Sequence, residues 1–188
     1  MVKNYNEMLY NNRRIELDRL ILRPFEVGDA HDLFECIGDE ESVRYLMQAW
    51  TGSLEEARSR IYDTYLATPN GYWAIEHKES GKMIGNIVIK LNHDNDRAHF
   101  GYVLNKAFWG KGYAGEALKA IVDLCFMQLE VNRVGDGHYV GNEASGRVME
   151  KVGLKLEGTL RGYEKIRGVQ HDLVIYGLTR DAYLEGLQ

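Results

Sequence analysis

The sequence predicts a mixed α/β fold, of the α+β class, built on a mostly antiparallel sheet. Three segments rich in aliphatic and aromatic residues follow one another, Tyr72–His77, Met83–Leu91 and Ala98–Leu104, and only short polar turns separate them. Such a series predicts an antiparallel meander. The third segment runs into a glycine-dense turn and then into a helix with one apolar face, so we expect helices to flank the sheet.

The first seventy residues predict one strand and then helices. Arg14–Glu26 has the composition of a strand that Pro24 closes or confines to an edge. A helix should start at Gly28 or Asp29 and end near Gly38. Two more are expected, a short one with Val43, Tyr45 and Leu46, and a longer one in which Ser53 and Glu56 form a capping box and Leu54, Ala57, Ile61 and Tyr65 face the core.

The second half alternates between helices and strands. A long helix from Tyr113 to Leu129 should bury a face made of Leu118, Ile121, Val122, Cys125, Phe126 and Leu129, which recur every three or four residues. We then expect strands at Val134–Val140, Leu154–Leu160 and Leu173–Leu178, and a helix from Glu143 to Val152 that ends at Gly153. The sheet then has about seven strands.

Length, charge and cysteine usage limit the class of protein. A chain of 188 residues without repeats or linkers is most simply one domain, residues 1–188. The net charge of −5 argues against nonspecific nucleic-acid binding, which needs lysine and arginine. Cys36 and Cys125 lie on apolar helical stretches, which favours reduced buried thiols. Without an apolar leader or a run of about 20 apolar residues, we expect a soluble cytoplasmic protein with no membrane partner.

The turn from Trp109 to Gly115 is the most informative segment for function. Gly110, Gly112 and Gly115 let backbone N–H groups approach a ligand closely, and the helix that follows adds its unpaired N–H groups and positive dipole end. This arrangement is typical of a site for a phosphate or pyrophosphate. Glycines also gather at ordinary loops, so the strand before the turn and the helix after it are needed to support the interpretation.

Four blocks of the sequence carry a resemblance to a known family. They are Leu20-Ile-Leu-Arg-Pro-Phe, Phe108-Trp-Gly-Lys-Gly-Tyr-Ala, Asn142-Glu-Ala-Ser-Gly-Arg-Val-Met-Glu-Lys-Val-Gly and Leu156-Glu-Gly-Thr-Leu-Arg. They resemble the GCN5-related N-acetyltransferase (GNAT) superfamily, in particular its ribosomal-protein N-terminal acetyltransferase (RimJ/RimL-like) branch. Their order and spacing carry the resemblance, which covers nearly the whole chain. Trp109 departs from the arginine or glutamine of the wider superfamily but is usual in this branch. The resemblance implies the GNAT fold, with a splayed strand pair at the acetyl-CoA site.

The resemblance also implies a set of site residues. Acetyl-CoA (coenzyme A) would be the co-substrate, and a backbone N–H near Tyr102, Val103 or Leu104 would polarise the thioester carbonyl. Asn142 would bind coenzyme A, and Ser145 would bind it and donate a proton to the thiolate; the alternative is that Asn142 is only an N-cap and Ser145 an ordinary polar residue of the first turn. The remaining expected cofactor-binding residues are Trp109, Gly110, Lys111, Gly112, Tyr113, Ala114 and Gly115.

His99 marks a departure from the relatives. They often carry a glutamate two residues before the Gly101-Tyr102 pair, and this chain has His99 there. A histidine with a pKa near ~6.5 can act as the general base directly or through water. It is equally consistent with a half-exposed strand histidine without a catalytic role, because an α-amine with a pKa of ~7.7 to 8.0 needs no strong base.

We expect no metal. Asn92-His93-Asp94-Asn95-Asp96 alternates oxygen ligands as calcium loops do, but Arg97 stands where that loop needs glycine and Val103 where it needs glutamate. His138 and His171 lie on expected strands and are interpreted as structural or surface residues, and His31, His77 and His93 have no partner at ligand spacing.

The expected reaction is transfer of an acetyl group to a primary amine by direct attack in a ternary complex. The acceptor is interpreted as a protein N-terminal α-amine; a small amine, such as a polyamine, an amino acid derivative or an antibiotic, is the alternative. A non-catalytic acyl-CoA-binding module, and a homodimer, also stay open. Acceptor choice should depend on the loops at residues 40–53 and 163–170, with Glu40, Glu41, Trp50 and Tyr163 suited to a cationic amine.

Overall fold

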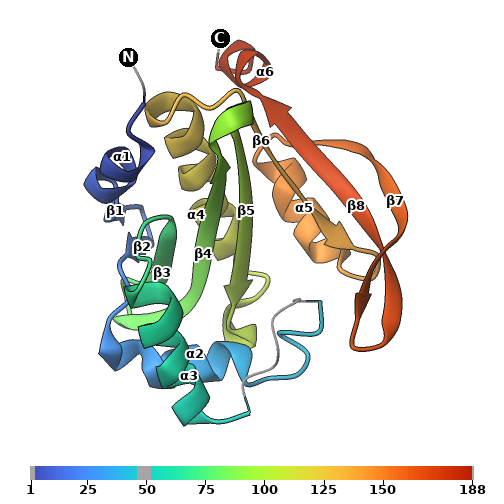
Figure 1. The fold of residues 1–188 in the computed structure, drawn as a ribbon. Coiled ribbons are helices and arrows are strands. Elements are labelled where there is room, and N and C mark those ends of the chain that lie inside the picture. Colours follow the sequence, from blue (N-terminus) through green and yellow to red (C-terminus); the bar gives the residue numbers. More distant parts are fainter. Residues whose placement is uncertain (1–2, 46–51, 188) are drawn as a thin grey trace. The chain divides into compact units, whose positions relative to one another are not determined.

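The computed structural model describes residues 3–45 and 52–187 and contains one mixed sheet of eight strands. The strand order is β1-β2-β3-β4-β5-β6-β8-β7 (Figure 1). The neighbouring pairs β1/β2, β2/β3, β3/β4, β6/β8 and β7/β8 are antiparallel, and β5/β6 is parallel. The predicted fold class is confirmed, with one strand more than expected.

The described residues fall into two compact units. The first comprises Met1–Ile89 and Gly101–Ala120, and the second comprises Lys90–Phe100 and Ile121–Gln188. The chain passes from one unit to the other within strands and within a helix. A single domain over residues 1–188 stays a prediction, and each unit is described by itself below.

The first unit begins with a helix and a hairpin that the sequence did not reveal. Helix α1 (Tyr5–Asn11) is capped by Asn4, whose side chain accepts a hydrogen bond from Glu7 N. The single strand expected at Arg14–Glu26 is wrong, because the chain forms two short strands, β1 (Ile15–Glu16) and β2 (Leu20–Arg23), around a turn. Leu17 N donates to Leu20 O at 2.9 Å across that turn. The reversal buries Leu20 and Leu22 completely.

The helices of the first unit follow the expected pattern with two exceptions. After a 3-10 turn at Val27–Asp29 come α2 (Ala30–Ile37) and α3 (Leu54–Arg60), and α3 continues as π-helix over Ile61–Leu66. The short helix expected around Val43 and Tyr45 is wrong, since residues 40–45 form turns; Leu46 lies outside the described residues. Leu54 does not face the core but is 43% exposed, because it is the first helical residue after the Ser53 cap.

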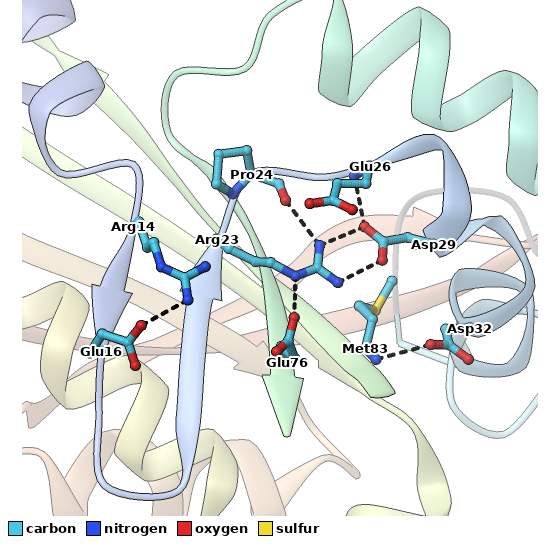
Figure 2. Close-up of polar contacts among 9 residues, drawn as sticks. All are labelled: Arg14, Glu16, Arg23, Pro24, Glu26, Asp29, Asp32, Glu76 and Met83. Carbon is cyan, nitrogen blue, oxygen red and sulfur yellow. Dashed lines mark hydrogen bonds and ion pairs between the residues drawn. The ribbon is translucent and has the colours of Figure 1, made fainter. Parts of the chain in front are cut away.

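An ion network joins β2 to the start of α2 (Figure 2). The two terminal guanidinium nitrogens of Arg23 donate to the carboxylate of Asp29, at 2.8 and 2.7 Å. The Nε of Arg23 donates to Glu76 Oε2 at 2.5 Å. Burial of these groups is nearly complete for Arg23 and Asp29, whose side chains are 10% and 7% exposed. The hydrogen bond to Asp29 is the main reason why the pKa of Arg23 lies above its usual range.

The predicted meander is present as β3 (Tyr72–His77), β4 (Lys82–Asn92) and β5 (Arg97–Leu104). Short turns join them, the second one a 3-10 turn at His93–Asn95. Within the first unit, β4 and β5 come very close at Gly85, where an added Cβ would lie 2.2 Å from Val103 O. Only glycine permits this backbone approach.

The long helix and the second unit confirm the remaining elements. Helix α4 (Tyr113–Asp123) continues as π-helix over Leu124–Gln128. All six residues of the predicted apolar face are completely buried. The second unit adds β6 (Arg133–Tyr139), α5 (Glu143–Lys151), β7 (Lys155–Ile166), β8 (Val169–Thr179) and α6 (Arg180–Glu185). The acceptor loop expected at residues 163–170 is mostly strand, because β7 and β8 extend to a tight turn at Arg167 and Gly168, both at positive φ.

Candidate active site

The glycine turn of the first unit is held at both ends by hydrogen bonds. Before it, a 3-10 turn at Lys106–Phe108 is capped by the side chain of Asn105, which accepts from Ala107 N at 3.0 Å. Trp109 then donates from Nε1 to Leu104 O at 2.9 Å. The structure therefore joins the expected cofactor loop to the end of β5, where a backbone N–H was expected to polarise the thioester.

The backbone of the turn has the shape that a diphosphate needs. Gly110 and Gly112 have φ angles of 75° and 84°, a region that favours glycine. The first helical hydrogen bond is the one from Glu116 N to Gly112 O, so the N–H groups just before Glu116 belong to the helix N-terminus without intrahelical partners. No protein atom lies within 4 Å of the position that a Cβ would take at Gly110 or Gly115. This open, donor-rich backbone fits the diphosphate of coenzyme A.

A chain of buried hydrogen bonds supports the first residue of α4. Tyr113 Oη lies 2.9 Å from His77 Nε2, and His77 Nδ1 lies 2.9 Å from Ser80 Oγ. The His77 ring also packs edge-on against Phe108, with the ring centroids 5.5 Å apart. His77 therefore has a structural role. Its contact with Tyr113 joins residues 36 positions apart and could not be predicted from a local pattern.

In the second unit, β5 and β6 separate after a short pairing. Arg97 pairs with Arg133 and Ala98 with Val134. Further along, Phe100 N donates to Asp136 Oδ2 at 3.2 Å. Asp136 Oδ1 accepts from Gly137 N at 2.8 Å. The Asp136 carboxylate therefore connects β5 to β6 within the second unit.

A cavity of about 270 Å³ opens in the second unit at this divergence. His99 and Asp136 both line it, and His99 Nδ1 lies 3.7 Å from Asp136 Oδ2, with the two side chains 48% and 34% exposed. Tyr163 and Leu160 of β7 are also part of its wall. The cavity therefore combines an imidazole and a carboxylate with apolar surface, and it is also lined by Arg97 and by Arg133, which pairs with Glu157.

The start of α5 holds the other two expected site residues. Asn142 is at the N-cap position, but its side chain makes no capping hydrogen bond. Instead Glu143 Oε1 accepts from Gly141 N at 2.9 Å. Asn142 and Ser145 are both partly exposed, and Ser145 N donates to Asn142 O at 3.0 Å. The interpretation of Asn142 as a side-chain cap is therefore not supported, and its role in binding coenzyme A stays a prediction.

The expected site residues are divided between the units. Trp109 to Gly115 and Tyr102 to Leu104 belong to the first unit, whereas His99, Asn142 and Ser145 belong to the second. Sequence reasoning missed Asp136, because a single acidic residue inside an apolar strand segment gives no signal of what it will face. It also missed Arg19, which binds Glu116 and Lys111 O beside the glycine turn.

Three residues of α2 lie close enough together to be tested as metal ligands. Ligand atoms of His31, Asp32 and Glu35 lie within 4.8 Å of one another, whereas no partner at ligand spacing was expected for His31. Lys82 Nζ lies 2.6 Å from Glu35 Oε2 and 3.6 Å from Asp32 Oδ1. Its hydrogen bond with Glu35 is the main reason why the pKa of Lys82 is raised and that of Glu35 lowered. The lysine ammonium thus occupies the place of a cation, and the absence of a metal stays an expectation.

The family is established by comparison with known proteins. A family model described as "Acetyltransferase (GNAT) domain" matches residues 19–155. The Bacillus subtilis protein "Uncharacterized N-acetyltransferase YoaA" is 32% identical over 170 residues, which are 88% of this chain and 96% of that protein. A second protein of that species, "Putative ribosomal N-acetyltransferase YdaF", is 30% identical over 87% of this chain and 92% of its own length.

The solved structures agree with this assignment. A GNAT-family acetyltransferase from Bacillus anthracis superposes with a TM-score of 0.82, at 23% identity, over 89% of this chain and 99% of that one. The chain belongs to the GNAT acetyltransferase family and is an N-acetyltransferase. Enzymes of this family use acetyl-CoA and an amine acceptor. Among the described residues, no helix is both long and apolar enough to cross a membrane.

Proposed function

We propose that the chain acetylates a protein N-terminal α-amine, as in the ribosomal-protein (RimJ/RimL-like) branch of the family, by direct attack in a ternary complex. The observation that carries this proposal is the cavity of the second unit, in which His99 and Asp136 share one wall. A carboxylate attracts the ammonium form of the acceptor, and an imidazole can take the proton that the nitrogen loses as it is acylated.

The proposed contacts with the co-substrate are those that the family resemblance implies. Backbone N–H groups from Gly110 to Gly115 bind the diphosphate, with Trp109 next to them, and a backbone N–H of Tyr102, Val103 or Leu104 polarises the carbonyl. Asn142 binds coenzyme A, which agrees with its uncapped side chain. Acetyl-CoA supplies the thioester whose C–S bond breaks as the C–N bond forms. Ser145 gives a hydrogen bond to the departing thiolate, or gives it a proton that the hydroxyl regains from solvent water.

The proton of the amine goes to His99 or to water. An α-amine has an ordinary pKa of about 7.7 to 8.0, so a substantial part is already neutral near pH 7.5. His99 needs only to accept the proton that the nitrogen loses on acylation. The Asp136 carboxylate is its neighbour in the cavity, with Oδ2 3.7 Å from His99 Nδ1.

A peptide acceptor is favoured over a free small amine by the cavity wall. Leu160 and Tyr163 are 43% and 53% exposed and offer apolar surface to residues that follow an N-terminus. The name of the relative YdaF points to the same class of acceptor. Ribosomal proteins are made in the cytoplasm, and the two buried free cysteines suit that compartment. The proposal includes no metal.

The test measures free coenzyme A released from acetyl-CoA with three acceptors: a peptide with a free N-terminus, the same peptide blocked at its N-terminus, and a polyamine. We expect release with the free peptide, with the acetyl group on its α-nitrogen by mass spectrometry. Asp136→Asn should raise KM for the peptide, and His99→Gln should lower kcat below about pH 8, where the base matters most. His93→Ala, an exposed histidine of the turn before β5, is the matched control.

Three outcomes would contradict the proposal in different ways. Turnover of the polyamine but not of the free peptide would assign the enzyme to small amines. Binding of coenzyme A without release in any acceptor mixture would indicate a non-catalytic acyl-CoA-binding module. Unchanged kinetics in both the Asp136 and His99 variants would remove the cavity from the acceptor site. Turnover that persists in EDTA is expected, since no step uses a metal.

A further inference from the structure

Arg19 makes four contacts with the glycine turn and with the residue that follows it, all within the first unit. Its backbone N donates to Glu116 Oε1 at 2.9 Å and its Nε to Glu116 Oε2 at 2.7 Å. One terminal nitrogen donates to Lys111 O at 3.0 Å. The guanidinium carbon lies 4.6 Å from the centre of the Tyr113 ring. Arg19 lies in the β1–β2 turn, 92 positions from Lys111 in the sequence. It therefore contacts the proposed diphosphate site from a distant part of the chain.

The contact with Lys111 fixes the direction of a neighbouring N–H group. In a trans peptide the C=O and the following N–H point in opposite directions, and no cis peptide occurs in the described chain. Because Lys111 O points to Arg19, the N–H of Gly112 points away from Arg19. Gly112 leaves space beside Arg19, since its Cβ position would be 3.5 Å from an Arg19 terminal nitrogen. Arg19 thus orients one of the donors expected to bind the diphosphate.

The contact with Arg19 compensates the negative charge of Glu116. Glu116 lies in the first turn of α4, and its side chain is only 17% exposed. An unpaired carboxylate there would bind the free N–H groups of its own helix end and would repel a bound diphosphate. Both of its oxygens are instead held by Arg19. The ion pair keeps the carboxylate turned to the β1–β2 turn and cancels its charge.

We propose that Arg19 is a positioning residue for coenzyme A, which orients the Lys111–Gly112 peptide and keeps Glu116 away from the diphosphate. This inference rests on the cofactor site of the proposed function. It differs from a stabilising surface ion pair because it requires that the loss of Arg19 weaken ligand binding more than it weakens folding. It also requires that removal of the Glu116 charge repair part of the loss.

The test is the affinity for coenzyme A, measured by calorimetry without turnover. We expect Arg19→Met to weaken binding by about tenfold or more, through one unpaired carboxylate near the diphosphate. Glu116→Gln alone should change the affinity by less than about threefold, and the double variant should recover a part of the loss. Arg19→Lys keeps the charge without the fork and should lie between wild type and Arg19→Met. Arg14→Met, which breaks an exposed ion pair on the neighbouring strand, is the control and should not change the affinity.

A second ligand separates positioning from direct contact. Dephospho-coenzyme A keeps the diphosphate but lacks the 3′-phosphate, so the loss in Arg19→Met should be the same for both ligands. A loss seen only with coenzyme A would mean that Arg19 binds the 3′-phosphate itself, which overturns the proposal. Equal affinity of wild type and Arg19→Met also overturns it while leaving the proposed function intact. A wild type that does not bind coenzyme A defeats the proposed function first, and thermal unfolding of each variant shows that it is folded.

Discussion

The Arg23 network offers a sharp test of the energetics in the first unit. Arg23→Met removes two bonds to Asp29, one to Glu76 and one to Pro24 O at 3.0 Å (Figure 2). Asp29 then keeps one hydrogen bond, from Glu26 N at 2.8 Å, although its side chain is only 7% exposed. A buried carboxylate without its cation costs several kcal/mol, so we expect a loss of about 3 to 5 kcal/mol in the free energy of unfolding.

The assay is urea unfolding at pH 7, followed by the fluorescence of the three tryptophans. The matched control is Arg14→Met in the neighbouring strand, where Arg14 and Glu16 pair at 2.8 Å but are 53% and 55% exposed. That pair should contribute less than about 1 kcal/mol. The double variant Arg23→Met/Asp29→Leu should recover part of the stability, because the most buried unpaired carboxylate is then removed and only Glu76, whose side chain is 23% exposed, has lost its cation. Losses for Arg23→Met and Arg14→Met within about 1 kcal/mol of each other would refute the reasoning from burial.

Three further predictions follow from backbone shape and burial. Gly112→Ala should weaken binding of coenzyme A by about fivefold or more, because alanine at a φ of 84° costs about 1 to 2 kcal/mol and shifts the turn; Gly81→Ala, at a φ of 63° in the β3–β4 turn, should lower stability without that effect. Gly85→Ala should lower kcat and the melting temperature, since its Cβ would lie 2.2 Å from Val103 O, whereas Gly158→Ala meets no atom within 4 Å. Burial raises the pKa of the Cys36 and Cys125 thiols from 9.0 to about 12. The free energy of unfolding should therefore fall as pH rises, because the unfolded chain ionises these thiols first.

The sign of the thiol effect follows from the direction of the pKa shift. Because the folded pKa is above the unfolded one, the stability is complete below pH 9 and is lost as pH rises towards 12. Each thiol should cost about 1.4 kcal/mol at pH 10. Urea unfolding at pH 8 and pH 10 should therefore differ less for Cys36→Ala/Cys125→Ala than for wild type. Equal pH dependence of the two proteins would contradict the prediction for the thiols. Unchanged affinity of Gly112→Ala for coenzyme A would contradict the prediction for the glycine turn, and unchanged kcat of Gly85→Ala would contradict the prediction for Gly85.

The sequence located the elements whose patterns are local. The apolar face of the long helix, the glycine turn before it and the meander from Tyr72 to Leu104 are all present. Local patterns failed where two short elements share one apolar stretch. Residues 14–26 looked like one strand because the β1–β2 turn contains no glycine, and α1 was missed because its buried face has only Tyr5 and Leu9.

By itself, the sequence determined the family-like motifs, the glycine-rich turn between a strand and a helix, and the residues Asn142 and His99 as candidates, because these depend on spacing along the chain. Only the tertiary structure decided what each side chain meets. Asp136 accepts a hydrogen bond from Phe100 N, and Arg19 reaches Glu116 from 97 residues away. Such contacts are fixed by which elements pack together, and the free energy of that packing is spread over the whole core instead of being written in any local pattern.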